Sequence, residues 1–183
     1  ALVENKDPRT IPGVIFRGKN GLVNNGIAPI IKDIDTLPLP ERDKFWAIPE
    51  SEKKNIDVSY ICTIRGCPYK CTYCASPFHW DRKTTRLRSP ESVIEEMKHL
   101  KKNYWYATKY DYSASANITK KESLKIADNT LVYFVDDVFT VHKKRVKKLL
   151  KMMIKQNLGM KWKCEARADH LDDEICELMA EAG

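Results

Sequence analysis

Strand-like and helix-like segments alternate from residue 58 to the end of the chain, and this order restricts the fold more than any other feature. Three apolar runs are typical of β-strands: residues 58–64, 130–135 and 160–167. Three stretches with apolar residues at helical spacing are typical of amphipathic helices: residues 90–103, 142–156 and 172–182. A β-α-β-α-β-α order is typical of parallel strands joined through helices that pack against the sheet. The sequence therefore predicts an α/β fold, with the nearly continuous apolar run at 130–135 buried on both faces of the sheet.

The first 57 residues lack this alternation and are rich in turn-forming residues. Asn20-Gly21 lies between two apolar runs, which predicts a β-hairpin. Pro38 and Pro40 exclude a helix at that point and favour extended chain. We therefore expect residues 1–57 to form an extended arm or linker with a hairpin, and residues 58–183 to form the α/β core.

Two further features concern the limits of the core. Residues 104–129 are polar and irregular, so we expect an inserted loop with a short helix around residues 122–127. The chain ends where the last helix should lead into a fourth strand. A third strand with an unpaired edge is an unusual end for a sheet, so we expect this chain to be a fragment of a longer protein.

Composition narrows the class of protein. The chain has 183 residues, of which 43% are hydrophobic, enough for one domain with a buried core. No apolar run approaches the roughly 18 residues of a membrane helix, and no signal peptide is recognisable. Six cysteines are too few for a disulfide-dense scaffold, which favours a metal or redox site. We expect a cytoplasmic protein without a membrane partner.

The net charge of +7 is concentrated in one segment. Seven basic side chains lie in the helix expected at 142–156: Lys143, Lys144, Arg145, Lys147, Lys148, Lys151 and Lys155. A basic helix face is most often solvated surface, and no nucleic-acid recognition motif accompanies it. The sequence therefore does not favour a nucleic-acid partner.

Three cysteines, Cys67, Cys71 and Cys74, follow the first strand with the spacing Cys-x3-Cys-x2-Cys. Three thiolates can hold zinc or an iron–sulfur cluster. Structural zinc sites usually have four ligands, and His79 is a candidate for the fourth. A [4Fe–4S] cluster normally has four cysteine ligands, so three would leave one iron open to a substrate or cofactor. The other cysteines, Cys62, Cys164 and Cys176, are expected in the core.

The segment Cys67–Cys74, CPYKCTYC, resembles the cluster loop of radical S-adenosylmethionine (SAM) enzymes. The resemblance implies a [4Fe–4S] cluster whose open iron is chelated by the amino and carboxylate groups of SAM. It implies that one electron from the cluster cleaves SAM to methionine and a 5′-deoxyadenosyl radical. A reducing electron donor such as ferredoxin or flavodoxin is then an expected partner.

Four further segments resemble the subgroup of that family with an N-terminal cobalamin-binding domain: 11–40, 65–66, 86–91 and 134–140. The resemblance implies a partial TIM-like (β/α) barrel of the radical SAM type, with about three βα units. It also implies cobalamin in the full-length protein, although no Asp-x-His-x-x-Gly cobalamin motif is present here. The implied reaction is methylation of an unactivated carbon or ring formation on an unknown substrate, and the sequence assigns no catalytic residue beyond the cofactor ligands.

The resemblance also implies roles for four residues around SAM. Tyr73 would lie against the adenine, Asp136 and Asp137 would accept hydrogen bonds from the amino group, and Arg167 would meet the carboxylate. Each has a structural alternative. Tyr73 could be a packed loop aromatic, the two aspartates could be acids at the N-terminus of the basic helix, and Arg167 could form a structural ion pair.

Three other functions stay open on the sequence. An electron-transfer or binding module would need a fourth cluster ligand. A tRNA-modifying radical SAM protein would agree with the positive charge. A structural module would bind zinc instead of iron.

Overall fold

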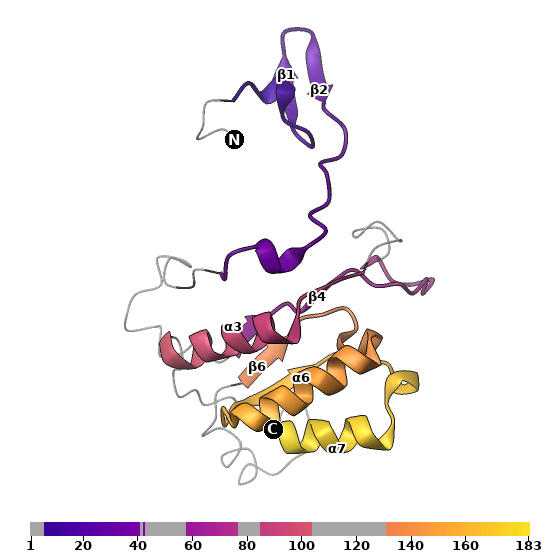
Figure 1. Ribbon diagram of the computed structural model, residues 1–183. Helices are drawn as coiled ribbons and strands as arrows, with labels where there is room; N and C mark the ends of the chain where they lie inside the picture. Colours follow the sequence, from indigo (N-terminus) through magenta and orange to yellow (C-terminus); the bar gives the residue numbers. More distant parts are fainter. Residues whose placement is uncertain (1–5, 41, 43–57, 77–84, 104–130) are drawn as a thin grey trace. The chain divides into compact units, whose positions relative to one another are not determined.

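The computed structural model describes residues 6–40, 42, 58–76, 85–103 and 131–183 (Figure 1). Contacts within the chain divide it into two units, Ala1–Lys32 and Asp33–Gly183. Residues 33–40, which we expected in the arm, therefore group with the larger unit. The expected insertion at 104–129, its short helix and His79 lie outside the described residues.

The smaller unit contains the hairpin that the Asn-Gly sequence predicts. Strand β1 (Ile15–Gly18) pairs antiparallel with β2 (Gly21–Asn24), after a short 3-10 helix, η1 (Pro8–Thr10). The turn residues are Lys19 and Asn20, and the positive φ of 121° falls on Gly21. The Asn25 side-chain amide donates to the carbonyls of Pro8 (2.7 Å) and Ile11 (2.8 Å), which fixes the segment before the hairpin.

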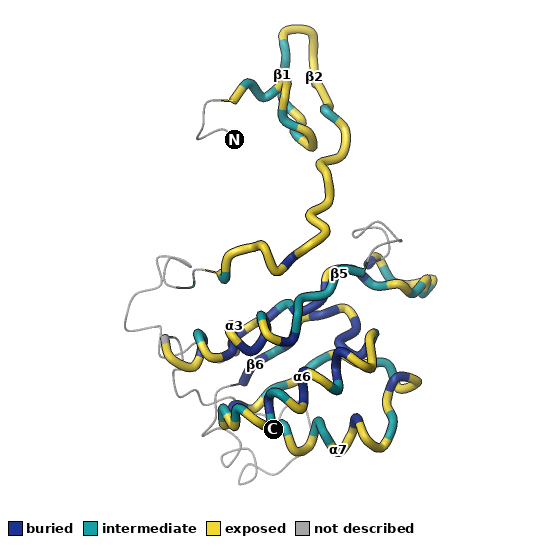
Figure 2. Tube along the Cα trace, in the orientation of Figure 1, coloured by how far each residue is buried: buried dark blue, intermediate teal, exposed yellow. Residues whose placement is uncertain are grey.

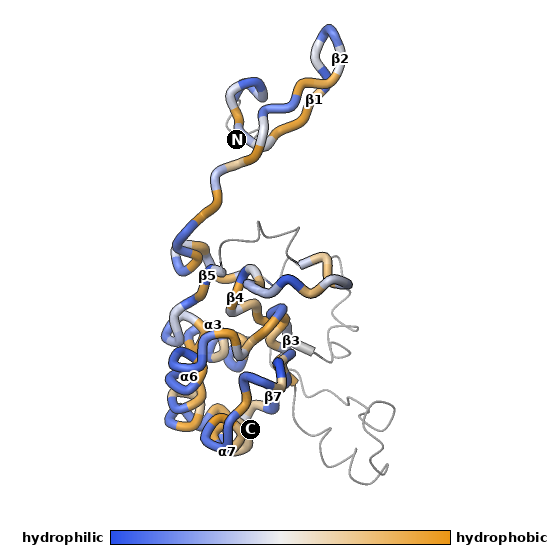
Figure 3. Tube along the Cα trace, turned by 90° about the vertical axis from the view of Figure 1, so that its right-hand side faces the viewer, coloured by the Kyte–Doolittle hydropathy of each residue, from blue (hydrophilic) through white to orange (hydrophobic). Residues whose placement is uncertain are grey.

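The larger unit is built on a three-stranded parallel sheet in the order β3-β6-β7. These strands are Val58–Ile61, Leu131–Phe134 and Lys161–Cys164. Three helices connect or follow them: α3 (Pro90–Asn103), α6 (Lys143–Gln156) and α7 (Asp173–Ala182). Figure 3 shows the three helices on one side of β3 and β7. The predicted α/β order with parallel strands is confirmed.

Local capping explains where two of the helices begin. The Ser89 hydroxyl accepts a hydrogen bond from the Ser92 amide at 3.1 Å, and Pro90 occupies the first helical position of α3. Asp172 does the same for α7, accepting from the Ile175 amide at 2.9 Å. Both starts agree with the sequence prediction.

The core lies between the helices and one face of the sheet (Figure 2). It contains apolar side chains of β3, β6, α3 and α6, and Trp162 and Cys164 of β7 pack against it. The core residues include Ile61, Val93, Met97, Leu100, Val132, Phe134, Val146, Leu149, Leu150 and Met153. Phe134 stacks on Phe139 of η3 (Phe139–Val141) with ring centroids 5.0 Å apart. Burial of these side chains supplies most of the driving force for folding of this unit.

The opposite face of the sheet differs from the prediction. Among the described residues of β6 the prediction holds only in part. Leu131 is buried on the same face as Tyr133, but Tyr133 is half-buried and Tyr60, beside it on β3, is 57% exposed. Tyr60, Tyr133 and Lys163 are aligned across the three strands on this face. The apolar run at 130–135 was misleading because Tyr133 and Val135 count as apolar although they are not in the core.

The first predicted strand, residues 58–64, is also divided. Strand β3 ends at Ile61, and Ile64–Arg65 form a separate strand, β4, which pairs antiparallel with β5 (Arg86–Leu87). The chain leaves the parallel sheet at Cys62 because the next backbone amides are bound by a side chain, as described below. The third predicted strand is likewise shorter than expected, since β7 ends at Cys164 and leaves Arg167 outside it.

The lysines of α6 pair with acids on neighbouring helices. Lys147 and Lys151 contact Glu174, Lys143 contacts Asp172, and Lys148 contacts Glu91 of α3. Arg145 was expected on the same solvated face, and this was wrong: it is only 9% exposed and binds backbone carbonyls inside the unit. No helix in the described ranges is long and apolar enough to cross a membrane.

Candidate functional site

Asp136, directly after β6, fixes the chain where it leaves β3. One carboxylate oxygen accepts from the amides of Thr63 (2.6 Å) and Ile64 (2.8 Å), and the other accepts from the Thr63 hydroxyl at 2.5 Å. Asp136 is 2% exposed, and burial raises the pKa of its carboxyl although these hydrogen bonds and Arg145 act in the opposite direction. The carboxylate thereby replaces a neighbouring strand as the acceptor for these amides.

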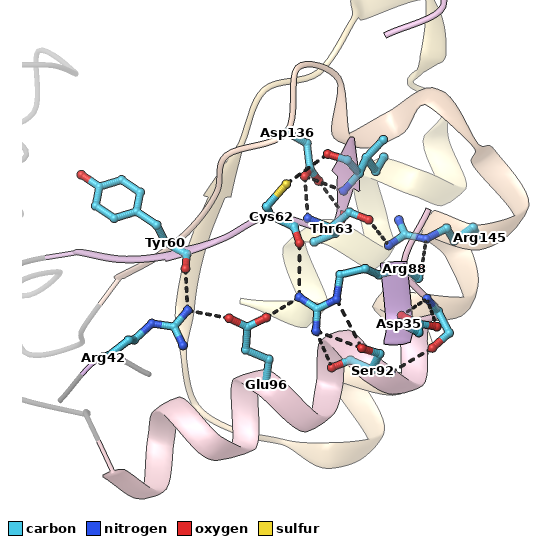
Figure 4. Close-up of polar contacts among 12 residues, drawn as sticks. Asp35, Arg42, Tyr60, Cys62, Thr63, Arg88, Ser92, Glu96, Asp136 and Arg145 are labelled. Carbon is cyan, nitrogen blue, oxygen red and sulfur yellow. Dashed lines mark hydrogen bonds and ion pairs between the residues drawn. The ribbon is translucent and has the colours of Figure 1, made fainter. Parts of the chain in front are cut away.

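A second polar layer holds the same stretch from the side of α3 and α6 (Figure 4). Arg145 donates to the carbonyls of Arg88 (2.7 Å) and Thr63 (3.2 Å). Arg88 in turn donates to the carbonyl of Cys62 at 3.2 Å and to the carboxylate of Glu96.

Glu96 sits between two arginines. It is 1% exposed, and its second oxygen lies 2.5 Å from Arg42, which also donates to the Tyr60 carbonyl at 2.8 Å. A buried charge is tolerated only when it is paired and hydrogen-bonded, and both arginines do this for Glu96. Backbone groups at residues 60, 62, 63 and 64 are therefore all bound by side chains.

The cysteine loop, residues 66–76, follows β4. Cys67, Cys71 and Cys74 are free thiols of intermediate exposure, and the Cys74 amide donates to the Cys71 carbonyl at 3.2 Å. Burial raises the pKa of Cys67, and the charges of Asp137, Cys74 and Cys71 raise it further.

The described residues contain no group of three or more His, Cys, Asp or Glu side chains that converges on one metal ion. In an iron–sulfur cube each cysteine binds a different iron, so the thiols need not converge on one point.

The other cysteines differ from these three. Burial raises the pKa of Cys62, whose thiol donates to the Ile64 carbonyl at 3.1 Å. Burial also raises the pKa of Cys164 to about 12, and Cys164 packs against the core as expected. Cys176 was expected in the core but is exposed on α7. Cys176 follows the buried Ile175 and lies on the solvent-exposed side of α7.

Among the described residues, two side-chain hydrogen bonds attach the cysteine loop to the segments after β6 and β7. The Tyr69 hydroxyl is hydrogen-bonded to Nε2 of His170, in η4 (Ala168–His170), and Nδ1 of His170 is 3.1 Å from the Thr140 hydroxyl. The Ser76 hydroxyl donates to the Asp137 carboxylate. The loop follows β3 by way of β4, Asp137 follows β6 and η4 follows β7, so all three come after the carboxyl ends of the parallel strands and lie at the same edge of the sheet.

The four residues expected around SAM have different environments in the structure. Tyr73 is 91% exposed, so it is not a packed loop aromatic. Asp137 is exposed at the loop and is bonded to Ser76. Arg167 lies 4.1 Å over the Tyr69 ring and forms the structural ion pair with Asp169 at 2.9 Å.

Asp136 has a different environment from the other three. Its carboxylate is buried and accepts three hydrogen bonds from Thr63 and Ile64, and its expected contact with the SAM amino group stays a prediction. Asp136 does not cap α6. This network could not be predicted from the sequence, because an acid after a strand does not reveal which backbone amides it will bind.

The chain belongs to the radical SAM superfamily, whose family model matches residues 61–183. It is 25% identical over its full length to an uncharacterized methyltransferase of Pyrococcus horikoshii, of which it covers 34%. It is 24% identical to the anaerobic magnesium-protoporphyrin IX monomethyl ester cyclase of Rubrivivax gelatinosus, with 97% of this chain and 28% of the cyclase aligned. The chain thus spans about a third of the length of these curated relatives.

A solved structure shares the fold. It is the radical S-adenosylmethionine methyltransferase TsrM from Kitasatospora setae, with cobalamin and a [4Fe–4S] cluster bound. The TM-score is 0.63 at 19% sequence identity, and the match covers 100% of this chain and 33% of TsrM.

Proposed function

We propose that this chain binds a [4Fe–4S] cluster through Cys67, Cys71 and Cys74 and leaves one iron for SAM. The observation that carries the proposal is the placement of three free, partly exposed thiols on one loop at the carboxyl edge of a parallel sheet. When bound, such a cluster supplies the electron that cleaves SAM and generates a 5′-deoxyadenosyl radical.

The donor set fits such a cluster. Thiolates are the usual ligands of iron–sulfur clusters, and the raised pKa of Cys67 means that ligand binding must displace its proton. Within the loop, Tyr73 is available for a cofactor because its side chain is exposed. Asp137 and Arg167 lie at the same edge of the sheet, and we propose that they contact SAM. Asp136 instead binds the backbone that leads into the loop.

We further propose that the sheet is the first half of a (β/α) barrel and that the whole protein is a cobalamin-dependent enzyme. The support is the fold shared with TsrM and the resemblance to a methyltransferase and a cyclase. Methylation or ring formation on a substrate of unknown class is the reaction this supports. A reducing donor such as ferredoxin or flavodoxin would supply the electron, in the cytoplasm.

Anaerobic reconstitution tests the cluster. Iron and acid-labile sulfide are expected in a ratio of about one to one, with four irons per chain. Replacing Cys67, Cys71 or Cys74 with Ala should abolish this content. Cys176→Ala is the matched control, because Cys176 is an exposed free cysteine outside the loop. Zinc without iron would contradict the proposal and support a structural zinc module.

Addition of SAM to the reduced protein tests the open iron. A change in the electron paramagnetic resonance spectrum is expected if SAM binds the cluster. An unchanged spectrum would indicate a fully ligated cluster and an electron-transfer module instead. Formation of 5′-deoxyadenosine by the whole protein would then test the enzyme itself.

A further inference from the structure

Tyr69 and His170 form a contact between the cysteine loop and η4, the segment that follows β7. Tyr69 lies between Cys67 and Cys71, and its hydroxyl is hydrogen-bonded to Nε2 of His170. The His170 residue is only 8% exposed. Nδ1 of the same ring is 3.1 Å from the hydroxyl of Thr140, which is fully buried. A neutral imidazole has one N–H and one unprotonated nitrogen, so it can donate to one hydroxyl and accept from the other.

These three residues come from three different strand connections. Tyr69 follows β4, Thr140 belongs to η3 after β6, and His170 belongs to η4 after β7. The Arg167 guanidinium covers the Tyr69 ring at 4.1 Å, which adds a cation–π contact on the same side chain. The rings of Tyr69 and His170 are themselves 5.4 Å apart.

The loop is therefore held at two points, and the chain just before it is held at a third. Asp136 binds Thr63 and Ile64, which precede the loop, His170 holds Tyr69, and Asp137 holds Ser76 at the end of the loop. The attachment at Tyr69 is the one that lies between two cysteines. It is therefore the attachment that bears most directly on the distance between Cys67 and Cys71.

We propose that His170 is a positioning residue for the cysteine loop, acting through Tyr69 and anchored by Thr140. The three side chains hold the loop in its ligand-binding arrangement before any ligand is present. Ordering a loop in advance lowers the entropy that ligand binding must overcome. The identity of the ligand rests on the proposed function, but the positioning of the loop does not.

Proteolysis of the ligand-free chain tests the positioning directly. Lys70 is exposed and adjacent to Tyr69, so a lysine-specific endoprotease can cleave after it once the loop opens. In His170→Ala or Tyr69→Phe, loss of the hydrogen bond should speed cleavage at Lys70 about fivefold. Cleavage after Lys19, in the hairpin turn of the other unit, is an internal reference that should not change. His142→Ala is the matched control, because His142 is exposed and makes no side-chain capping bond.

The double variant Tyr69→Phe/His170→Ala separates a specific contact from general loosening. Its cleavage rate at Lys70 should match that of His170→Ala alone, because both substitutions remove the same bond. His170→Gln should restore part of the protection, since its amide nitrogen can reach toward the position of Nε2. Single variants within twofold of the unmodified chain, or effects that multiply in the double variant, would overturn the proposal. Circular dichroism identifies any variant that fails to fold, and Tyr69→Phe and His170→Gln then carry the test.

A second measurement links the positioning to the cluster. The rate at which a chelator removes iron from the anaerobically reconstituted chain should rise severalfold in Tyr69→Phe and His170→Ala, but not in His142→Ala. If the unmodified chain takes up no iron, the proposed function fails while the Lys70 result still decides the role of His170. If iron is taken up but is lost at equal rates from all variants, the positioning proposal fails and the proposed function stands.

Discussion

Removing the Asp136 carboxylate should destabilise the larger unit more than any other single substitution near the loop. In Asp136→Ala, the amides of Thr63 and Ile64 and the Thr63 hydroxyl lose their shared acceptor. Asp136 is 2% exposed and Thr63 is fully buried, so water cannot readily replace the carboxylate. Each buried donor left without a partner costs about 1–3 kcal/mol, which gives about 3–9 kcal/mol for the three together.

Two matched variants set the scale for this loss. Thr63→Val removes only one of the three bonds and should lower the free energy of unfolding by about 1 kcal/mol. Asp137→Ala removes an exposed neighbour whose hydrogen bond within the described residues is to Ser76, and it should change the free energy of unfolding by no more than about 0.5 kcal/mol. Urea unfolding followed by circular dichroism measures all three. The reasoning is refuted if Asp136→Ala costs no more than Thr63→Val.

The remaining predictions concern pH, thiol reactivity and the buried charge. Burial raises the pKa of the Asp136 carboxyl, so the stability that its protonated form contributes is present below the unfolded pKa of 3.8 and is lost as pH rises through the folded pKa. Asp136→Asn cannot ionise and should therefore gain stability relative to the unmodified chain as pH rises. Urea unfolding across pH 3–7 measures this difference. Burial also raises the pKa of Cys67, so iodoacetamide should modify Cys67 more slowly than the exposed Cys176 at pH 8. Peptide mass spectrometry measures the two rates, and equal rates would contradict this prediction. Glu96→Ala leaves the guanidinium of Arg88 without its buried partner and should lower the free energy of unfolding by about 3 kcal/mol in the same assay. A decrease below about 1 kcal/mol would show that the pair is not buried as described.

The features that the sequence predicted correctly are those encoded by neighbouring residues. Ser89-Pro90 and Asp172 mark helix starts through bonds to amides three residues away. The alternation of apolar runs predicted the parallel sheet, because that pattern repeats within each strand and helix. The spacing of the three cysteines likewise lies within eight residues.

The features that the sequence could not reveal depend on contacts between distant segments. The break after β3 requires an acid 73 residues further along the chain, and nothing near Thr63 indicates it. Arg145 looked like one more cation on a basic helix, yet it reaches a carbonyl 82 residues away. His170 has no local signature at all, because its two partners lie 101 and 30 residues before it.

The long separation between Tyr69 and His170 has a consequence for biosynthesis. Tyr69, which lies among the cysteines, is translated 101 residues before its partner His170. At about 5–20 residues per second, a ribosome takes roughly 5–20 s to cover that distance. Until His170 has been synthesised, Tyr69 lacks this partner, so metal insertion that depends on the positioned loop must wait until synthesis has passed β7.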